Sequence, residues 1–280
     1  MKQNKLFGAA LSLLLISGLT ITSCETSEEV QPDAVSQDVL SRIEAADFNT
    51  NGVVAKTFMG ETGYLVEGDI FLTDAAINEL GRGEKIPTLE QYHTNNLVKV
   101  NGSSRTITIS VDPALGNIGS NALDDAIQMY NVQNTELVFQ RVPFGGKGKN
   151  GADIKVTEFY EMESGGYITL GRAAGFPTRK GDPAKGFGIN SRWFELSIAP
   201  TTAELAGTMA HEIGHCIGFR HSDYKTRESC GQNINEGNAG VGANHVPGTP
   251  TGSDNNSIMQ SCGPAITFNN HDKTAMDYMY

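Results

Sequence analysis

The sequence has few basic residues and no long apolar stretch after its first segment. Lysine and arginine number 21 against 32 acidic residues, which gives a formal charge of −11 at pH 7. A surface of that sign repels nucleic acid and anionic membranes, so we expect neither as a partner. Beyond residue 24, no stretch approaches the ~20 apolar residues that a membrane-spanning helix needs. Any membrane attachment is therefore expected through a lipid alone.

The first segment has the pattern of an export signal. Lys2 and Lys5 precede an apolar run, Leu6–Ile21, and the following residues lead to Cys24. This ending resembles a bacterial lipobox, which implies removal of residues 1–23 and lipidation of Cys24; an ordinary cleaved signal peptide is the alternative. The sequence thus predicts an exported protein anchored at the bacterial outer membrane or cell surface, with release after maturation as a further option.

Cysteine is also scarce, with four residues in the chain. If Cys24 carries lipid, an odd number remains, which allows at most one internal disulfide and a free thiol. An oxidising compartment favours a bridge between Cys230 and Cys262. Cys216 follows His215 directly, and we expect it to be a small buried residue.

Composition and periodicity divide the exported chain into two parts. Residues 24–100 are interpreted as a polar tether followed by a second unit. Residues 101–280 are predicted to form a compact α+β domain. Its expected elements are strands at Ile107–Val111, Leu137–Val142, Ile154–Tyr160, Tyr167–Leu170 and Trp193–Ile198, and a helix capped by Ser120 or Asn121.

The clearest helix begins after Pro200. Thr201 and Glu204 have the spacing of a capping box, and apolar residues then recur every fourth position as far as Ile217. Gly218 follows the last of them, where a helix is expected to end. This helix carries most of the motif HEIGHCIGFRH, residues 211–221.

The motif has the spacing of a metal site. Residues four apart on a helix differ by about 40° in direction, so His211 and His215 can point at one cation. His221 would lie about 240° around from His215 if the helix continued, so a sharp bend is required. Gly218 can supply it because glycine adopts positive φ at little cost. Three imidazoles with an open fourth position describe a catalytic Zn²⁺ site, beside which Glu212 would act as general base.

The pattern HExxHxxGxxH is the signature of the metzincin clan, and this form resembles the bacterial dual-action HEIGH-type metallopeptidases. The resemblance implies a twisted mixed sheet, a backing helix, an active-site helix and an irregular C-terminal subdomain. It also implies a Met-turn beneath the metal, for which Met259 is the best match; Met276 and Met279 are alternatives. The tyrosine that some members carry two residues later is replaced by Ser261.

A weaker resemblance lies upstream, at Leu65–Ile70. It is similar to the FxGD segment of astacin-like propeptides, with Val66 in place of phenylalanine and Gly68-Asp69 retained. The resemblance implies that residues 24–100 comprise the tether and a propeptide, in which Asp69 binds the zinc and keeps the enzyme latent; an ordinary Gly-Asp turn is the alternative. Activation would then require a cut near residues 82–105, which contain Arg82, Lys85, Lys99 and Arg105.

The sequence therefore predicts a monomeric zinc endopeptidase that hydrolyses protein or peptide substrates. An extended substrate could add itself to an exposed sheet edge, for which Tyr167–Leu170 is the candidate. One alternative is a lipid-anchored binding module with a structural zinc. Another is a zinc hydrolase that acts on something other than peptides.

Overall fold

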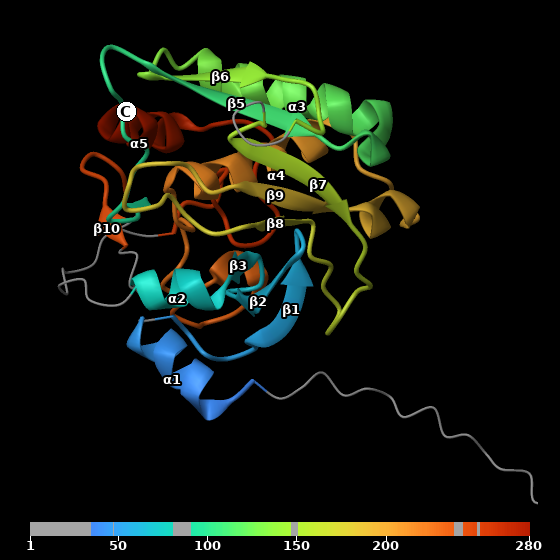
Figure 1. Ribbon diagram of the computed structural model, residues 1–280, viewed down its shortest axis with the longest axis vertical. Helices are drawn as coiled ribbons and strands as arrows, with labels where there is room; N and C mark the ends of the chain where they lie inside the picture. Colours follow the sequence, from blue (N-terminus) through green and yellow to red (C-terminus); the bar gives the residue numbers. More distant parts are fainter. Residues whose placement is uncertain (1–34, 47, 81–90, 147–150, 238–242, 251–252) are drawn as a thin grey trace, which may run out of the picture. The chain divides into compact units, whose positions relative to one another are not determined.

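Strands with apolar residues on at least one face build a mixed sheet at the centre of the protein (Figure 1). The computed structural model describes residues 35–46, 48–80, 91–146, 151–237, 243–250 and 253–280. These residues belong to one compact unit, Pro32–Tyr280. Among them, no helix is both long enough and apolar enough to cross a bilayer.

The sheet has eight strands in the order β1-β2-β3-β8-β9-β7-β5-β6. Strands β6, β5, β7 and β9 are parallel, and β8 pairs antiparallel with β9. Strands β1–β3 form an antiparallel meander that joins the sheet through a parallel pairing of β3 with β8. Their bounds are β1 Val54–Phe58, β2 Glu61–Val66, β3 Ile70–Leu72, β5 Arg105–Val111, β6 Leu137–Arg141, β7 Ile154–Phe159, β8 Gly171–Ala173 and β9 Gly186–Asn190.

Two long helices, α3 (Gly116–Asn131) and α4 (Thr202–Ile217), pack against each other. Buried residues of both helices and of β5, β7 and β9 share one hydrophobic core, in which the Tyr130 hydroxyl donates to the Ala210 carbonyl at 2.7 Å. The C-terminal helix α5 (Asn270–Met279) contributes to the same core. A short pair of strands, β4 (Tyr92–His93) and β10 (Asn244–His245), lies apart from the main sheet.

The N-terminal elements have a second, smaller core. Helices α1 (Gln37–Ala45) and α2 (Asp74–Leu80) surround the β1–β3 meander, and buried residues such as Val39, Ile43 and Ile70 pack together there. Figure 1 shows these elements together on the far side of β8 from β5 and β6. The predicted α+β class, with a mixed sheet, a backing helix and an active-site helix, is confirmed.

Several element boundaries differ from the sequence-based expectations. Helix α3 starts at Gly116, because the Asp112 side chain caps a preceding 3₁₀ turn, η1 (Pro113–Leu115), that leads directly into it. The strand expected at Trp193–Ile198 is wrong, since the Asn190 side chain caps a 3₁₀ helix, η3 (Ser191–Glu195). A further 3₁₀ turn, η4, spans Glu228–Cys230.

The expected edge strand is also misplaced. Tyr167–Leu170 is not a strand, and the strand begins one residue later as β8. Strand β9 was not expected, because Gly186 and Gly188 hide its pattern. Glycine is needed at position 188, where an added Cβ would lie 2.7 Å from the rings of both Phe58 and Phe159.

Candidate metal centre

Helix α4 starts with a complete capping box. The Thr201 hydroxyl accepts from the Glu204 amide at 3.2 Å, and the Glu204 carboxylate accepts from the Thr201 amide at 2.8 Å. These bonds satisfy backbone donors that a helix start leaves unpaired. Apolar residues such as Met209 and Ile213 then anchor the helix in the core. The helix is therefore held rigidly at the point where it carries the motif.

The helix ends at Ile217, and Gly218 turns the chain with φ of 116°. The Phe219 amide donates back to the Gly214 carbonyl at 2.9 Å, which closes the turn. A Cβ at position 218 would lie 2.9 Å from Leu97 Cδ2 and 3.0 Å from Thr94 Oγ1. Glycine is thus required here by both the backbone angle and the neighbouring segment.

The turn brings the third histidine back beside the other two. His215 Nε2 lies 3.0 Å from His211 Nε2 and 3.2 Å from His221 Nε2. All three imidazoles are buried. His211 Nδ1 faces the Ile258 carbonyl at 2.8 Å, and His215 Nδ1 faces the Phe219 carbonyl at 2.9 Å. Because a carbonyl can only accept, each Nδ1 donates and each Nε2 presents its lone pair to the common centre.

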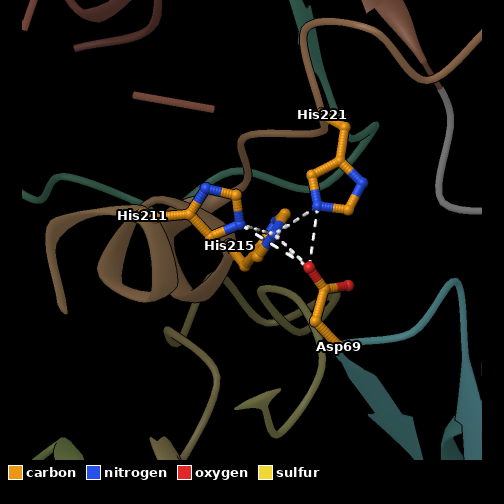
Figure 2. A group of neighbouring side chains, drawn as sticks. All are labelled: Asp69, His211, His215 and His221. Atoms are coloured by element: carbon orange, nitrogen blue, oxygen red, sulfur yellow. Dashed lines mark hydrogen bonds and ion pairs between the residues drawn. The ribbon is translucent and has the colours of Figure 1, made fainter. Parts of the chain in front are cut away.

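Asp69 completes the cluster from the loop between β2 and β3 (Figure 2). Its Oδ2 atom lies 2.9 Å from His221 Nε2, 3.7 Å from His211 Nε2 and 4.0 Å from His215 Nε2. The ligand atoms of all four residues lie within 4.8 Å of one another. Asp69 Oδ1 is buried without a hydrogen-bond partner. Three imidazoles and one carboxylate are a donor set that suits zinc, so the residues fit this metal.

Glu212 lies next to the cluster and packs against Gly171, the first residue of β8. An added Cβ at Gly171 would lie 2.2 Å from Glu212 Oε1, so the glycine makes room for this carboxyl group. Glu212 Oε2 is buried and has no hydrogen-bond partner. Burial, together with the nearby charge of Asp69, raises the pKa of Glu212 well above its usual value.

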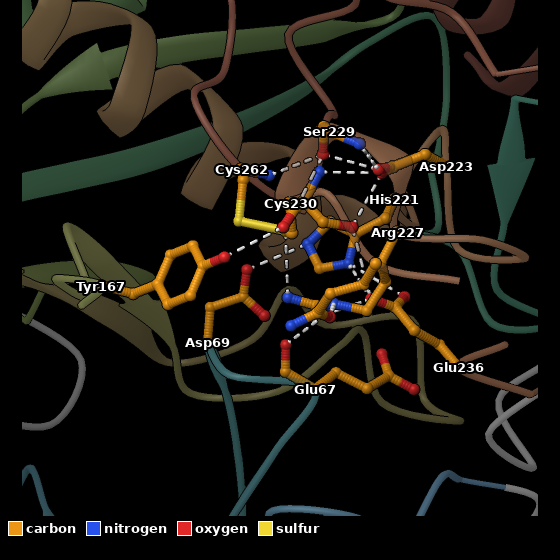
Figure 3. The surroundings of a disulfide bond; sticks show 12 residues. Glu67, Asp69, Tyr167, His221, Asp223, Arg227, Ser229, Cys230, Glu236 and Cys262 are labelled. Carbon is orange, nitrogen blue, oxygen red and sulfur yellow. Dashed lines mark hydrogen bonds and ion pairs between the residues drawn. A yellow bond between two sulfur atoms is a disulfide. The ribbon is translucent and has the colours of Figure 1, made fainter. Parts of the chain in front are cut away.

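A buried network of charges surrounds His221 (Figure 3). Its Nδ1 atom lies 3.0 Å from the carboxylate of Glu236, which also contacts Arg227. Arg227 donates to the backbone carbonyl of Glu67 at 2.6 Å, and the Glu67 carboxylate pairs with Arg220 at 3.0 and 3.1 Å. The network therefore joins the third histidine to the loop that carries Asp69.

The network and the burial of the histidines shift their pKa values in opposite directions. Burial tends to lower the pKa of His221, but the carboxylates of Asp69 and Glu236 outweigh it and raise this pKa well above the usual value. Burial, aided by His211 and His221, lowers the pKa of His215 well below it. Burial also raises the pKa of Glu67 to about 8, against the effect of Arg220. Because Arg220 Nη2 lies 3.0 and 3.1 Å from the two Glu67 oxygens, we describe this group as a carboxylate paired with the guanidinium.

Met259 lies beneath the histidine-bearing part of α4. It is buried, and an added Cβ at Gly214 would lie 2.6 Å from its sulfur atom. The preceding carbonyl, of Ile258, is the one that orients His211. Met276 and Met279 lie instead on α5, in the main core. The hydroxyl of Ser261 donates to Asp223 at 2.7 Å.

Cys230 and Cys262 form a disulfide beside the cluster (Figure 3). Cys216 is a free, buried thiol, and burial raises its pKa well above the usual value. Cys24, Arg82 and Lys85 lie outside the described residues. Sequence reasoning did not single out Glu67, Glu236, Arg227 or Asp223, because each reaches the centre through the fold and belongs to no spaced motif.

A cavity of about 480 Å³ opens beside the cluster. His211, Glu212 and Thr208 of α4 form part of its wall. The remaining wall comes from the Asp69 loop, from residues between 161 and 171 that follow β7 and reach β8, and from residues around the disulfide. Glu212 and His211 thus face the cavity, while His215 and His221 are fully buried behind them.

A bent zinc-binding helix, an adjacent buried glutamate, a methionine beneath the histidines and a mixed sheet together define a zinc metallopeptidase of the metzincin type. The chain belongs to the family described as dual-action HEIGH metallo-peptidases, which it matches over residues 64–280. A search of curated proteins finds no match.

Several solved structures resemble parts of the chain at low identity. A structure of myroilysin is 13% identical, with a TM-score of 0.42, and the match covers 66% of this chain and 96% of that one. The hatching enzyme HCE-1 of the medaka fish Oryzias latipes is 14% identical, with a TM-score of 0.34 and coverage of 59% and 72%. Archaemetzincin from Methanopyrus kandleri is 11% identical, with a TM-score of 0.31 and coverage of 63% and 95%.

Proposed function

We propose that the protein is an exported, lipid-anchored zinc endopeptidase that is made in a latent form. The observation that carries this proposal is the fourth position of the histidine cluster, which Asp69 fills from a segment outside the motif. His211, His215 and His221 would hold the metal in both the latent and the active state. Protein or peptide substrates follow from the family.

Bound zinc would supply Lewis acidity for the scissile carbonyl and would lower the pKa of a water molecule. Glu212 is the general base of the proposed reaction: its carboxylate takes a proton from the attacking water and passes it to the leaving amine. Its position beside the imidazoles, in the wall of the cavity and against Gly171, suits this role. Burial and, after it, the charge of Asp69 both raise the pKa of Glu212, so departure of Asp69 removes one of the two causes.

The β2–β3 hairpin supports latency in a second way, because its strand β3 covers the edge of β8. The Ala173 amide of β8 donates to the Asp69 carbonyl at 2.8 Å, and Ile70 is paired with Ala173. Without β3, β8 would be the edge strand of the remaining sheet, next to the cavity. A peptide substrate could then add itself as a strand to β8. We therefore place the substrate edge at β8 and no longer at Tyr167–Leu170.

Buried ion pairs support the hairpin's inhibitory position. Arg220, inside the zinc motif, pairs with the Glu67 carboxylate, and both side chains are fully buried. Arg227 binds the Glu67 carbonyl, and Glu67 and Gly68 both have positive φ in the loop that presents Asp69. Removing one partner of a buried pair leaves an uncompensated charge, so the hairpin does not detach readily while the chain is intact.

Export and lipidation rest on the sequence of residues 1–24. The proposed lipid on Cys24 would anchor the protein at the bacterial outer membrane or cell surface, and residues 25–37 would act as a tether. We propose that the enzyme acts as a monomer. Globomycin-type inhibition of lipoprotein processing, followed by a mass measurement of the membrane-bound protein, would test the modification: an unchanged mass would exclude it.

Latency is tested with intact, full-length protein. We expect wild type to show little hydrolysis of casein and intact Asp69→Ala protein to be active without any cut. The exposed Asp125, on α3, supplies the matched control Asp125→Ala, which should stay latent. Intact Asp69→Ala protein that is no more active than intact wild type would refute the switch.

Catalysis is tested with Glu212→Ala in the Asp69→Ala background. General-base catalysis contributes roughly 10²–10⁴-fold, so we expect a loss of that size with zinc still bound. A protein that keeps zinc and shows no hydrolysis in any background would favour the structural-zinc binding module. Activity on esters or amides that are not peptides, with none on a peptide library, would favour the other hydrolase.

A further inference from the structure

Residues 91–100, here called the strap, run between the hairpin region and β5. The strap consists of Gln91, strand β4 and the residues that follow as far as Val100. Gln91, Tyr92, Thr94 and Val98 are buried. The sequence predicts that this segment belongs to the propeptide, but in the structure it contacts the residues around the metal centre.

The first half of the strap holds the bend of the zinc motif. The Thr94 amide donates to the Gly218 carbonyl at 2.8 Å, and the Arg220 amide donates to the Tyr92 carbonyl at 2.9 Å. His93 forms an antiparallel bridge with Phe219, whose carbonyl orients His215. The strap therefore supports the backbone on both sides of Phe219, two residues before His221.

Gln91 connects the strap to the Met-turn. Its side-chain amide donates to the Ser257 hydroxyl and to Asp272 Oδ1, both at 3.1 Å. The other oxygen of Asp272 accepts from the Ile258 amide at 3.0 Å, and the Ile258 carbonyl orients His211. Two hydrogen-bonded residues thus separate Gln91 from the first zinc-ligand candidate.

The second half of the strap is fastened to the catalytic core. The Val98 amide donates to the Tyr280 hydroxyl at 3.1 Å, and this hydroxyl donates to the carbonyl of Ile217, the last residue of α4. The Lys99 amide donates to the Gly181 carbonyl at 3.0 Å, and the Arg105 guanidinium donates to the Lys99 carbonyl at 3.0 Å. The Lys99 backbone is thus hydrogen-bonded at both its amide and its carbonyl, while the Lys99 side chain is exposed.

The strap and the β2–β3 hairpin stand on different sides of the centre. Glu67, Gly68 and Asp69 of the hairpin line the cavity, whereas no strap residue is among the described residues that line it. The hairpin thus obstructs the cavity, and the strap supports the histidines from behind. Loss of the first would open the site, while loss of the second would remove hydrogen bonds that orient the ligands.

We propose that the strap is a permanent part of the metal centre, with Gln91 as a positioning residue for the Met-turn. The activating cut then falls on the N-terminal side of Gln91 and leaves residues 91–100 attached to the catalytic part. This moves the start of that part from residue 101 to residue 91 and excludes Lys99 and Arg105 as activation points. The position of the cut rests on the proposed latency; the positioning role of Gln91 does not.

Limited digestion of full-length, zinc-loaded wild type with trypsin tests where the resident part begins. Trypsin can cut after Lys99 and after Arg105. We expect the resistant core that keeps zinc through gel filtration to begin before Gln91, as determined by N-terminal sequencing and mass. A core that has lost residues 91–99 and still binds zinc would overturn the proposal.

The role of Gln91 is tested by Gln91→Met in the full-length chain, with zinc affinity measured by chelator competition. Methionine keeps the length of the side chain and removes both amide donors. Direct partners of metal ligands are typically worth 10–100-fold in metal affinity; because two residues separate Gln91 from His211, we expect a weakening at the lower end, about 10-fold. The absorption spectrum of the cobalt-substituted protein should shift as well, because the ligand geometry changes.

Gln133→Met is the matched control, since the Gln133 amide donates to a helix carbonyl, of Met129, at 2.9 Å on α3, away from the centre. It should leave zinc affinity and the cobalt spectrum unchanged. A folded Gln91→Met protein with wild-type affinity and spectrum would overturn the positioning role. If Gln91→Met does not fold, the digestion of wild type decides. Because neither readout uses peptide hydrolysis, a failure of the proposed peptidase latency leaves both results interpretable.

Discussion

Two regions bring ligand atoms to the same point by different means. Helix α4 and its bend place three imidazoles through residues 211–221, a segment whose spacing and local hydrogen bonds determine its own shape. The β2–β3 hairpin brings Asp69 to the same place from 142 positions before His211, through a parallel pairing with β8 and buried ion pairs.

The difference teaches which part of such a centre is independent of the rest. The helix and its bend are held by the strap, by the Ile258 carbonyl at His211 and by the Glu236 carboxylate at His221. The hairpin packs in its own smaller core and reaches His221 through Asp69. In the proposed latent form, a permanent ligand set and a removable one would share a single metal position.

The largest expected effect comes from changing the bend by Gly218→Val. Valine is strongly disfavoured at φ of 116°, and its Cβ would lie 2.9 Å from Leu97 Cδ2. Backbone strain of about 1–3 kcal/mol and overpacking of about 1–3 kcal/mol give a destabilisation of roughly 2–6 kcal/mol. We expect zinc binding to be lost as well, measured by metal analysis of the purified protein. Gly231→Val, at a positive φ with no neighbour within 4 Å, separates strain from crowding and should keep zinc.

The next effect concerns the disulfide, which stabilises the catalytic region only. It closes a separation of 32 residues, for which the chain-entropy relation predicts about 3–4 kcal/mol. The double variant Cys230→Ser/Cys262→Ser should therefore unfold at a lower urea concentration than wild type. Wild type with its disulfide reduced should unfold at the same lower concentration as the double variant. Latency should be kept, since Asp69 does not depend on the bridge; activity in the intact double variant would show that the two regions are coupled here.

These two tests also mark how far sequence reasoning extends. The motif, its bend and the capping box are local, so residue spacing and elementary helix geometry were sufficient to place them. Strand β9 and the start of α3 were missed because a close approach of aromatic rings and an aspartate-capped turn override the apolar pattern. Gln91 and Glu236 carry no signal at all, since their partners are distant in sequence.

A smaller effect is expected where the two regions meet at the Glu67–Arg220 pair. Glu67→Gln keeps the shape but leaves Arg220 without its nearest carboxylate, although Glu236 remains 3.9 Å away. Breaking a buried pair costs about 3–5 kcal/mol, and the second carboxylate should reduce this to roughly 2–3 kcal/mol. The loss falls on the hairpin, so intact protein should show activity between that of wild type and Asp69→Ala. The exposed Glu44 on α1 supplies the control Glu44→Gln; full latency in Glu67→Gln would mean that Asp69 and β3 suffice.

The smallest expected effect concerns Glu161, which has one ion pair with the hairpin region and one within the catalytic region. Glu161 pairs with Lys56 of β1 at 2.6 Å and with Arg172 of β8 at 2.8 Å. Burial tends to raise the pKa of Glu161, but hydrogen bonds from Lys56 and Arg172 outweigh it and hold the pKa below 4.5.

Because the folded-state pKa is the lower one, the stabilisation is present above pH 4.5 and is lost as pH falls through the folded-state pKa. Between about pH 6 and pH 3, wild type should therefore lose about 0.5–1 kcal/mol more stability than Glu161→Gln in urea unfolding. Lys56→Met should remove most of this difference if the stabilisation comes from the contact between the regions, and Arg172→Met should then remove little of it. In that case, acid should loosen the hairpin before it affects the catalytic core. A difference that widens on acidification would mean that the two cations do not stabilise the Glu161 carboxylate.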